Sequence, residues 1–464
     1  MKINFLDKKN NLKIQKIIKT KYEYLIIGSG PAAVILSNEL ISKIKNKNPK
    51  ILMIEKGDYN QKMYKKIINK NLPIKTDSRV FSVGGSSNEW SNISSYFEKF
   101  EMESSKKKNL WPLNHKDLIN YYKNLDKKYG FGYEKINKKS LKLPFQTRQF
   151  IIKKNPTNFK KFIDFSKIDF IYNCEIKSIN DFKNLSHAYT GQKNIFFSSK
   201  KLILCCGGIE TVNLILKSFK SNKLKKMKNK KIVGRYFMNH PKLNLGLLMY
   251  PKNDLIKPLL IKQNNKFSTY YGISLNQKLQ KKLNLVNSYV RFEKAYGNLT
   301  KFLNVFKSSI IEKLLKKKNK FQYKIRLFCE MRPNKKNMIQ IKKKKLFSSY
   351  SFSKDDYETI TLLTKKILKH FSENFEKETN INYSLKYLNN KSEDASHHMG
   401  GLIYNSIKKK TTIDKNLKIY GLENIYVCSS AVFPTSGSVN PTMTIGALAV
   451  RLADYLTKKQ FFKS

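Results

Sequence analysis

Apolar runs and polar turns alternate along the chain, and their spacing predicts a mixture of strands and helices. Runs at Tyr22–Ile27 and Ile51–Ile54 are short and mostly apolar, which predicts buried strands. Between them, a glycine-rich hexapeptide at 28–33 opens an apolar helical pattern. Later in the chain, Phe321–Cys329 alternates polar and apolar positions like a sheet strand, whereas Asp355–Phe375 repeats its apolar residues at helical spacing.

The first strand, the glycine turn and the helix follow the order that a dinucleotide site requires. Gly28 permits a tight turn, Gly30 lets the backbone approach a pyrophosphate, and the small Ala33 allows the helical pattern from Val34 to pack closely on the strand. The helix N-terminus then favours anionic phosphates. Glu55 follows Ala33 by 55 − 33 = 22 residues, near the roughly 20 expected for a carboxylate that binds ribose hydroxyls. An acid at this position favours FAD or NAD over NADP.

A strongly apolar helix is predicted near the C-terminus, directly after an Asn440-Pro441 step. Proline suits the first helical position because it has no N–H group to leave unpaired, and Asn is favoured just before it. An ordinary capped core helix explains this step on its own. The alternative is a polar side chain and a helix N-terminus held over a redox cofactor, and the nucleotide pattern at the other end of the chain favours that interpretation.

Further motifs lie between the two ends. They are Gly84-Gly85-Ser86-Ser87-Asn88-Glu89-Trp90, Trp111-Pro112 with Tyr121-Tyr122, Leu202–Leu216 around Gly207-Gly208, Val233-Gly234-Arg235, His240-Pro241, Ser396-His397-His398-Met399-Gly400-Gly401 and Asn440-Pro441-Thr442. With the N-terminal pattern they resemble the glucose/methanol/choline (GMC) family of FAD-dependent oxidoreductases, and the segment 111–122 is similar to its sugar- and polyol-oxidising branch. The motifs occur in family order over nearly the whole chain, and residues 240–390 match least well.

The resemblance implies an α/β fold, α+β overall, in which two domains are interleaved. A discontinuous Rossmann-like FAD-binding domain is expected over residues 20–100, 165–240 and 391–464. A substrate-binding or cap region, built on an antiparallel sheet, is expected over residues 101–164 and 241–390.

The resemblance also implies FAD as the cofactor, bound non-covalently because no His or Cys lies in the 84–95 loop. Two positions depart from the family pattern. Ser429 stands where an aspartate is frequent, which removes a charge near the flavin's ribityl chain, and Ser91 stands where a glycine is common. The expected cofactor contacts are Gly28, Gly30, Pro31, Ala32, Ala33, Glu55, Lys56, Gly84, Gly85, Ser86, Ser87, Ile176, Gly207, Ser429, Ser430, Pro441 and Thr442.

The resemblance assigns the chemistry to His397 and Asn440. His397 is the expected base for the substrate hydroxyl proton, since histidine titrates near neutrality, while hydride passes from carbon to flavin N5. Asn440 is expected to hold the substrate oxygen. The helix starting at Pro441 and Thr442 directs its N–H groups at the flavin pyrimidine edge, where negative charge develops. Consecutive side chains of an extended segment point to opposite faces, so only one of His397 and His398 can face the flavin.

Two other interpretations of the histidines are less favoured. His397 and His398 with Glu393 and Asp394 could form a metal site, but no further ligand lies at suitable spacing, and we expect no metal. His240 precedes a proline in a predicted turn, which favours a structural role.

The chain is strongly basic, with 92 Lys and Arg against 33 Asp and Glu, a net charge of +59 and a pI near 10.0. Such a charge invites nucleic acid or an anionic membrane as a partner. Only seven of these cations are arginine, the residue that dominates phosphate and base recognition. The abundance of Lys, Asn, Ile, Phe and Tyr favours a composition bias toward A/T-rich codons, and the runs 316–320 and 342–345 read as solvated faces or loops. We expect no specific nucleic-acid partner, and peripheral membrane contact stays open.

Five cysteines, an odd number, lie mostly in apolar runs, which disfavours a disulfide framework and favours a reducing compartment. Met1–Lys21 is charged throughout, and no apolar run approaches about 18 residues, so neither a standard export signal nor a membrane span is predicted. A cytoplasmic location is therefore expected.

The leading hypothesis is an FAD-dependent alcohol dehydrogenase or oxidase acting on a CH–OH group of a sugar, polyol or sugar-containing intermediate, with an unidentified electron acceptor. The alternatives are another flavoenzyme with two dinucleotide sites and a basic nucleotide-fold binding protein without turnover. A yellow preparation with flavin bands supports either flavoenzyme, whereas a colourless protein that binds DNA in a salt-dependent way supports the third.

Overall fold

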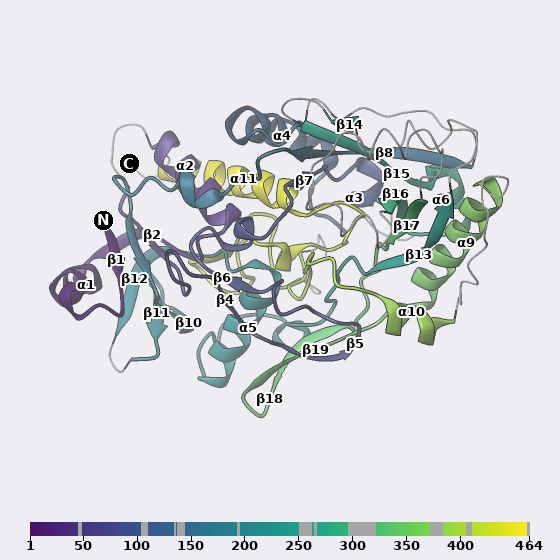
Figure 1. The fold of residues 1–464 in the computed structure, drawn as a ribbon. Helices are drawn as coiled ribbons and strands as arrows, with labels where there is room; N and C mark the ends of the chain where they lie inside the picture. The colour runs from purple at the N-terminus through teal and green to yellow at the C-terminus, as the bar shows by residue number, and fades with distance from the viewer. Residues whose placement is uncertain are drawn as a thin grey trace.

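Two β-sheets, joined by helices and long loops, form the framework of the molecule, with the first sheet at the left and the second at the right of Figure 1. One continuous hydrophobic core includes Leu25 and Phe170 of the first sheet and Ile273 and Leu327 of the second. The computed structural model describes residues 1–44, 49–103, 110–133, 136, 144–192, 195–249, 262–263, 267–295, 322–371, 384–404 and 411–461.

The first sheet has eight strands. In order they are β1 (Lys2–Asn4), β9 (Asp169–Tyr172), β3 (Ile51–Ile54), β2 (Lys21–Ile27), β12 (Phe196–Leu204), β11 (Ser186–Thr190) and β10 (Ile176–Asp181), with β20 (Ile425–Val427) also paired to β12. The neighbours from β1 to β12 are parallel, and so is the β12–β20 pair. The strands expected at Tyr22–Ile27 and Ile51–Ile54 are confirmed as β2 and β3.

The helices α2 (Pro31–Lys43) and α5 (Gly207–Lys220) directly follow the parallel strands β2 and β12. Parallel strands place their carboxyl ends at one edge of the sheet, so both helices begin at that edge. The α2 helix starts earlier than expected, at Pro31, because proline is preorganised for the first helical turn. The C-terminal helix α11 (Thr442–Phe461) packs against α2 and against α4 (His115–Tyr129).

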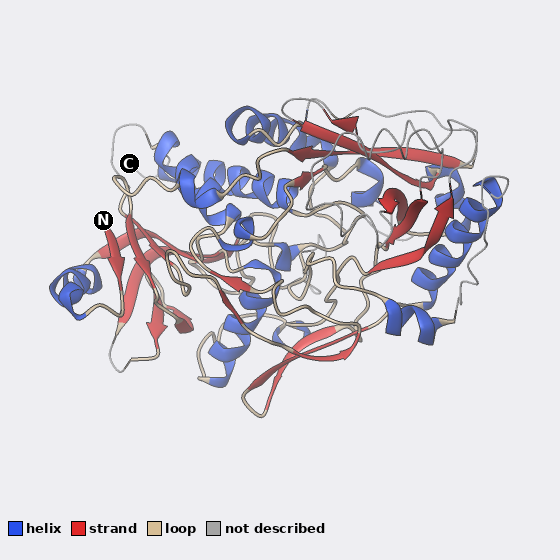
Figure 2. Ribbon diagram, in the orientation of Figure 1, coloured by secondary structure: helices blue, strands red, loops and turns tan. Residues whose placement is uncertain are grey.

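The second sheet has seven strands, and every pair in it is antiparallel, which confirms the expected antiparallel sheet. In order they are β13 (Lys242–Met249), β17 (Gln322–Phe328), β16 (Tyr289–Ala295), β15 (Phe267–Leu275), β8 (Phe145–Lys153) and β7 (Ile93–Ser94), with β14 (Lys262–Gln263) beside β15. The alternating run expected as a strand is β17. The expected amphipathic helix is α9 (Lys354–Phe371), at the outer edge of this sheet in Figure 2, and residues 372–375 of that prediction lie outside the described residues.

Smaller elements complete the described chain. They are β4 (Met63–Tyr64) paired with β6 (Val80–Phe81), the sheet of β18 (Met338–Lys342), β19 (Lys345–Tyr350) and β5 (Ile68–Asn71), the helices α1 (Asn11–Lys19), α3 (Lys99–Glu103), α6 (Gln277–Leu283) and α10 (Leu385–Lys391), and the short 3₁₀ helices η1 (Lys8–Asn10), η2 (Gly85–Asn88), η4 (Phe159–Phe162), η5 (Lys230–Ile232) and η9 (Ser430–Val432). The lysine run 342–345 forms the exposed turn of the β18–β19 hairpin, as expected, and the run 316–320 lies outside the described residues.

The chain passes between the two sheets several times. The first sheet takes strands from residues 2–54, 169–204 and 425–427, and the second takes strands from 93–94, 145–153 and 242–328. The two sheets are therefore interleaved in sequence, and residues distant in the chain meet between them. Within the described part of the chain, no helix is both long and apolar enough to cross a membrane.

Candidate active site

A cavity of about 640 Å³ lies where the first sheet meets the second. The parallel strands β2, β3, β12 and β20 all end at its wall, and each delivers a residue there: Gly28, Glu55, Gly207 and Ser429. The strands β13, β15, β16 and β17 of the second sheet line the opposite side. The site is therefore outside the carboxyl ends of a parallel sheet, where open α/β sheets bind their ligands.

Two glycine loops form a tight cradle in this wall. Gly28 adopts a left-handed φ of 101°, and a Cβ atom on it would lie 2.6 Å from the carbonyl oxygen of Cys205 in the neighbouring strand's end. Gly85 has a φ of 55°, and a Cβ on it would lie 2.9 Å from Cα of Gly30. Backbone meets backbone at both places, so only glycine fits without movement. The resulting cradle presents N–H groups and the start of α2 to the cavity, which suits a pyrophosphate.

Glu55 is held at the end of β3 by three hydrogen bonds. Its Oε2 accepts from the amide of Ser29 at 3.0 Å and from the Ser29 hydroxyl at 2.7 Å, and its Oε1 accepts from the amide of Gly57 at 2.8 Å. Burial raises the pKa of Glu55, and these hydrogen bonds oppose that rise. The Ser29 hydroxyl also accepts from the amide of Gly84 at 3.2 Å, so the acid and both glycine loops form one unit. A carboxylate has further lone pairs, which fit the hydroxyl donors of a ribose.

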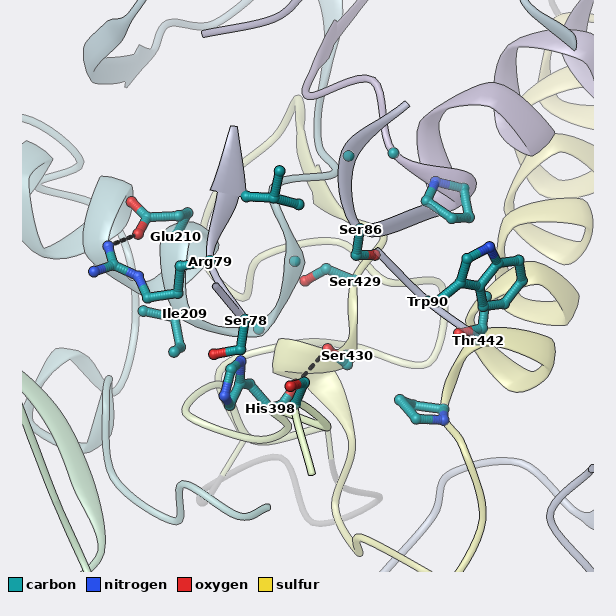
Figure 3. Close-up of a pocket in the computed structure, with 18 of the residues that line it drawn as sticks. Ser78, Arg79, Ser86, Trp90, Ile209, Glu210, His398, Ser429, Ser430 and Thr442 are labelled. Carbon is teal, nitrogen blue, oxygen red and sulfur yellow. Dashed lines mark hydrogen bonds and ion pairs between the residues drawn. The ribbon is translucent and has the colours of Figure 1, made fainter. Parts of the chain in front are cut away.

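The two serines after β20 are positioned by neighbouring helices. The Ser429 hydroxyl accepts from the hydroxyl of Thr211 in α5 at 3.2 Å and from the amide of Ala431 at 3.3 Å. The Ser430 hydroxyl donates to the carbonyl of His398 at 2.6 Å, the contact drawn at the centre of Figure 3, where both serines and Ser86 are labelled. Serine at position 429 is thus a hydrogen-bonded capping residue of η9, and it needs no charge to hold this turn.

The loop after Trp90 tolerates a serine where the family pattern has glycine. Ser91 is exposed, and the left-handed position of the loop is the next residue, Asn92, with a φ of 50°. Asn is one of the few side chains that adopts this conformation readily. The loop therefore makes its turn one residue later.

Most of the expected cofactor contacts do line the cavity: Gly28, Gly30, Pro31, Ala32, Glu55, Lys56, Gly85, Ser86, Ile176, Gly207, Ser429, Ser430, Pro441 and Thr442. Ala33, Gly84 and Ser87 are not among the lining residues. Ala33 is fully buried within α2, and the Ser87 hydroxyl donates to the carbonyl of Gly84 at 2.6 Å and accepts from the amide of Phe159 at 3.0 Å. These three residues support the wall from behind.

His397 lies opposite His240 because of a short antiparallel bridge between Met238 and Met399. In an antiparallel pair the residue two positions further along one strand faces the residue two positions back along the other, which brings the rings of His240 and His397 together. Their Nδ1 atoms are 2.9 Å apart. Gly400 makes this pairing close, because a Cβ on it would lie 2.2 Å from the carbonyl oxygen of Tyr236.

The hydrogen bonds of these two rings determine where their protons are. Nε2 of His240 lies 2.8 Å from the carbonyl oxygen of Gly437, which can only accept, so Nε2 carries the hydrogen. In a neutral ring Nδ1 of His240 is then an acceptor, and Nδ1 of His397 must donate to it. Consequently Nε2 of His397 holds a lone pair, and the side-chain amide of Asn440 donates to it at 2.8 Å. The structure thus brings His397 and Asn440 together and selects the basic nitrogen.

Both rings are neutral at neutral pH. Burial lowers the pKa of His240 to about 4. Burial also holds the pKa of His397 well below its ordinary value, and the neighbouring His240 lowers it further. A neutral His397 can accept a proton, which is the property that a general base needs.

Asn239 and Asp394 position the histidine pair. Oδ1 of Asn239 accepts from the backbone amides of His240 at 2.8 Å and His397 at 3.1 Å, and its Nδ2 donates to Oδ1 of Asp394 at 2.7 Å. Burial alone would raise the pKa of Asp394, but His398 and these hydrogen bonds hold it below its ordinary range. Nε2 of His398 lies 3.4 Å from Asp394, so the rings of His397 and His398 diverge, as expected for consecutive residues of an extended segment, although both border the cavity.

Among the described residues, no group of three or more His, Cys, Asp or Glu side chains could hold a metal ion. His398 pairs with Asp394, and His397 pairs with His240 and Asn440. The Asn440 side chain is engaged with His397, while the carbonyl of Pro441 accepts the first helical bond of α11, from Ile445 at 2.9 Å. The helix thus begins at Thr442, one residue later than expected.

Sequence reasoning missed the contact of His240. A structural role in a turn was predicted, and the structure instead places this ring directly behind His397. The signal was present in the sequence as an isolated His-Pro step, but nothing local indicates that residues 238 and 399, far apart in the chain, form a bridge. The roles of Asn239 and Asp394 in positioning the histidines were missed for the same reason.

A dinucleotide cradle that opens onto a neutral histidine suits an enzyme that oxidises an alcohol with a bound flavin, so the fold and the site define the class of FAD-dependent oxidoreductases acting on CH–OH groups. Residues 338–449 match the family model described as GMC oxidoreductase. This match over the C-terminal part of the chain supports the resemblance to the GMC family that the motifs indicated. No curated protein sequence matches it significantly.

Solved structures share the fold at low sequence identity. Pyridoxine 4-oxidase from Mesorbium loti is 11% identical with a TM-score of 0.63, and the match covers 94% of this chain and 99% of that one. A formate oxidase is 12% identical with a TM-score of 0.57, and the match covers 96% of this chain and 99% of that one. A formate oxidase from Aspergillus oryzae RIB40, studied for its FAD modification, gives the same values. The chain therefore spans the whole of this fold.

Proposed function

We propose that this enzyme oxidises a CH–OH group of a sugar, a polyol or a sugar-containing intermediate, with His397 as the base and Asn440 as the group that holds the substrate oxygen. The observation that carries the proposal is the lone pair on Nε2 of His397, which the hydrogen-bond chain from Gly437 through His240 directs toward Asn440 beside the cavity. The sugar and polyol assignment rests on the similarity of the 111–122 segment.

The proton of the substrate hydroxyl passes to Nε2 of His397. The ring then carries a positive charge and keeps its Nδ1 hydrogen bond to His240, whose neutral acceptor nitrogen stabilises the cation. The Asn440 amide can turn its donor from His397 to the substrate oxygen without competing for the proton, since an amide does not titrate. These residues bind, orient and deprotonate the alcohol.

The residues of the cavity fit FAD. Glycine at position 85 lets its loop approach Gly30 closely beside the start of α2, which suits a pyrophosphate. Glu55 offers acceptor sites to a ribose, and Pro441 and Thr442 place the start of α11 at the wall. FAD, when bound, supplies the hydride acceptor. We propose non-covalent attachment, supported by the lack of His and Cys in residues 84–95. Acid precipitation should release all flavin into the supernatant, and flavin retained in the pellet would contradict this.

Anaerobic mixing of the FAD-bound enzyme with a panel of alcohols and sugars tests the catalytic assignment. His397→Ala should slow flavin bleaching by about 100-fold or more while FAD stays bound, because a positioned base contributes about 10²–10⁴-fold. His187→Ala, a histidine in β11 outside the cavity, is the matched control and should bleach at the parent rate. Bleaching of His397→Ala at the parent rate would overturn the assignment.

The electron acceptor and the compartment also belong to the proposal. The two structural neighbours carry the name oxidase, so dioxygen is the first acceptor to test, followed by quinones and redox dyes. We propose a cytoplasmic location, supported by five cysteines that are all free and mostly buried. A small-molecule alcohol and one electron acceptor are the partners that this function requires.

A further inference from the structure

Three cations of the second sheet line the cavity: Lys242 of β13, Arg291 of β16 and Arg326 of β17. We call them the cationic wall. Their carboxylate partners, Glu293 and Glu393, are not among the cavity-lining residues. None of the described residues of this sheet that line the cavity is acidic. The substrate side of the cavity therefore presents positive charge.

The basic composition of the chain does not account for this wall. Lysine causes the excess charge, whereas only seven arginines occur in 464 residues, and two of them are here. Arg291 and Arg326 are direct partners in the antiparallel β16–β17 register. Like charges opposite each other destabilise a sheet. Such a pair needs a compensating group or a ligand.

Arg291 is fully engaged within the protein. Its guanidinium lies over the rings of Tyr270 at 4.9 Å and Phe328 at 4.6 Å. Its Nη1 donates to the hydroxyl of Tyr270 at 3.0 Å, and it is also paired with Glu293. Arg291 is therefore a fixed part of the wall rather than a free donor.

Arg326 and Lys242 are compensated in charge but keep donors available. Nε of Arg326 lies 3.6 Å from Glu293, its Nη2 lies 3.6 Å from Glu393, and Nζ of Lys242 lies 3.5 Å from Glu393. These distances are at or beyond the limit of a hydrogen bond. Nε of Arg326 is buried and has no hydrogen-bond partner among the described residues. The charges of the wall sum to 3 − 2 = +1 when both carboxylates are included.

Arg326 and Lys242 line the same cavity as His397 and Asn440. Lys242 lies two residues after His240 in the chain. The charge of Lys242 is one of the influences that lower the pKa of His397. A small molecule whose hydroxyl reaches His397 can therefore also reach this wall.

We propose that the alcohol substrate carries an oxyanion, a carboxylate or a phosphate, which Arg326 and Lys242 bind while the reacting hydroxyl lies at His397. One added negative charge neutralises the wall, and a planar or tetrahedral oxyanion matches the arginine fork. This inference rests on the proposed function, because it names the substrate class of the same site.

Binding of inorganic phosphate and of acetate to the FAD-bound enzyme tests the wall without turnover. Each anion is titrated at constant ionic strength while flavin absorbance and the unfolding temperature are followed. We expect saturable binding that Arg326→Gln and Lys242→Gln weaken at least tenfold, with Arg235→Gln, an arginine outside the cavity, unchanged. If the Arg326→Gln variant does not retain FAD, the comparison is made with the Arg326→Lys and Lys242→Gln variants instead.

Matched substrate pairs then identify the anion. Glycerol is compared with glycerate and glycerol 3-phosphate, and glucose with gluconate and glucose 6-phosphate, as anaerobic reductants of the flavin. We expect the carboxylate or the phosphate member to act at concentrations at least tenfold lower than the neutral member. Equal action of neutral and anionic members, with no saturable anion binding, would overturn the inference and leave the proposed function standing. Saturable, Arg326-dependent anion binding with no reduction by any alcohol would support the wall and count against the proposed function.

Discussion

At the reacting end of the cavity, His397 can act as a base only if its own hydrogen is on Nδ1. The tautomer is selected by the carbonyl of Gly437, which accepts from His240 and leaves that ring with one acceptor nitrogen, 2.9 Å from His397. The side-chain amide of Asn440 then donates a hydrogen bond to Nε2, the other ring nitrogen of His397. In this series of hydrogen bonds, from Gly437 through His240 and His397 to Asn440, only one assignment of donors and acceptors gives every group a partner.

Replacing Asn440 by aspartate should shift the acidic limb of the pH–activity profile to higher pH. In the parent, burial holds the pKa of His397 below its ordinary value of 6.5, so the ring is a base at neutral pH. A carboxylate beside Nε2 favours the protonated ring and so raises this pKa. The pH dependence of anaerobic flavin reduction measures the shift. Asn440→Ala should slow reduction without moving the limb upward, and an unmoved limb in Asn440→Asp would contradict the assigned contact.

Replacing His240 by phenylalanine should slow flavin reduction by about ten- to a hundred-fold, with FAD retained, because Nδ1 of His397 loses the acceptor that selects its tautomer. His240→Gln should recover part of the rate, since an amide oxygen can accept the same hydrogen. Stopped-flow reduction at pH 8 compares the two variants. Equal rates in both variants would show that His240 only fills space.

At the scale of elements, the cavity is made by strand ends and helix starts. Four parallel strands stop at one edge, and α2, α5 and α11 begin beside them. Glycines are required where these ends approach each other closely. The atoms that a larger side chain would meet differ from one glycine to the next. A Cβ atom on Gly28 would meet a backbone carbonyl, whereas one on Gly130, at the end of α4, would lie 3.4 Å from the flexible end of Lys153.

Gly28→Ala and Gly130→Ala should therefore differ, although both glycines have positive φ, of 101° and 66°. At Gly28 a methyl group must displace the carbonyl of Cys205 as well as adopt a strained φ, which costs about 2 kcal/mol or more and reduces bound FAD. At Gly130 only the backbone strain remains, about 1 kcal/mol. Urea unfolding and flavin content per chain measure both effects. Full FAD content in Gly28→Ala would contradict the close approach.

At the scale of the whole molecule, a buried ion pair near the active site connects three segments that are distant in sequence: α3, β8 and the loop at Ser438. Glu101 of α3 accepts from Arg148 of β8 at 2.7 Å, and from the amide and the hydroxyl of Ser438 at 2.7 Å each. Ser438 lies next to Gly437, which receives the hydrogen bond of His240. The pair thus connects the antiparallel sheet to the loop that sets the tautomer of His397.

Glu101→Gln should lower the free energy of unfolding by about 3 kcal/mol, because Arg148 stays buried, loses its closer carboxylate and keeps only Glu98, at 3.6 Å, as a counter-charge. Thermal and urea unfolding measure the loss. The double variant Glu101→Met with Arg148→Met removes both charges and should be more stable than Glu101→Gln. A single variant as stable as the parent would mean that water reaches this pair.

The stability of the enzyme should fall as pH drops from about 6.5 to about 4, in part through His240. The pKa of His240 is lowered from 6.5 to about 4 by burial, so the unfolded chain binds more protons than the folded one between these values. The contribution is fully present above pH 6.5, falls by on the order of 3 kcal/mol down to pH 4, and is constant below. Unfolding free energies of the parent and His240→Gln across this range isolate the effect. Parallel curves for the two proteins would exclude His240 as its source.

Local pattern was sufficient for β2, β3, β17, α9 and the glycine turn, because hydrophobic periodicity and backbone freedom are properties of adjacent residues. Motif spacing also pointed to Glu55, His397 and Asn440. The support of His397 could not be found in this way. Met238 and Met399, whose bridge positions His240, are 399 − 238 = 161 residues apart in the chain, so no local pattern indicates that they pair.

By itself, the sequence indicated the nucleotide-binding unit, the resemblance to the GMC family and the two residues expected to carry the chemistry, since each depends on residue type and short spacing. Only the tertiary structure decided which nitrogen of His397 is basic, that Ser429 is satisfied by Thr211 without a charge, and that Arg291 and Arg326 face the cavity from paired strands. The physical reason is that hydrogen-bond polarity, burial and the summed charge of a wall belong to groups that meet only after distant segments have packed together.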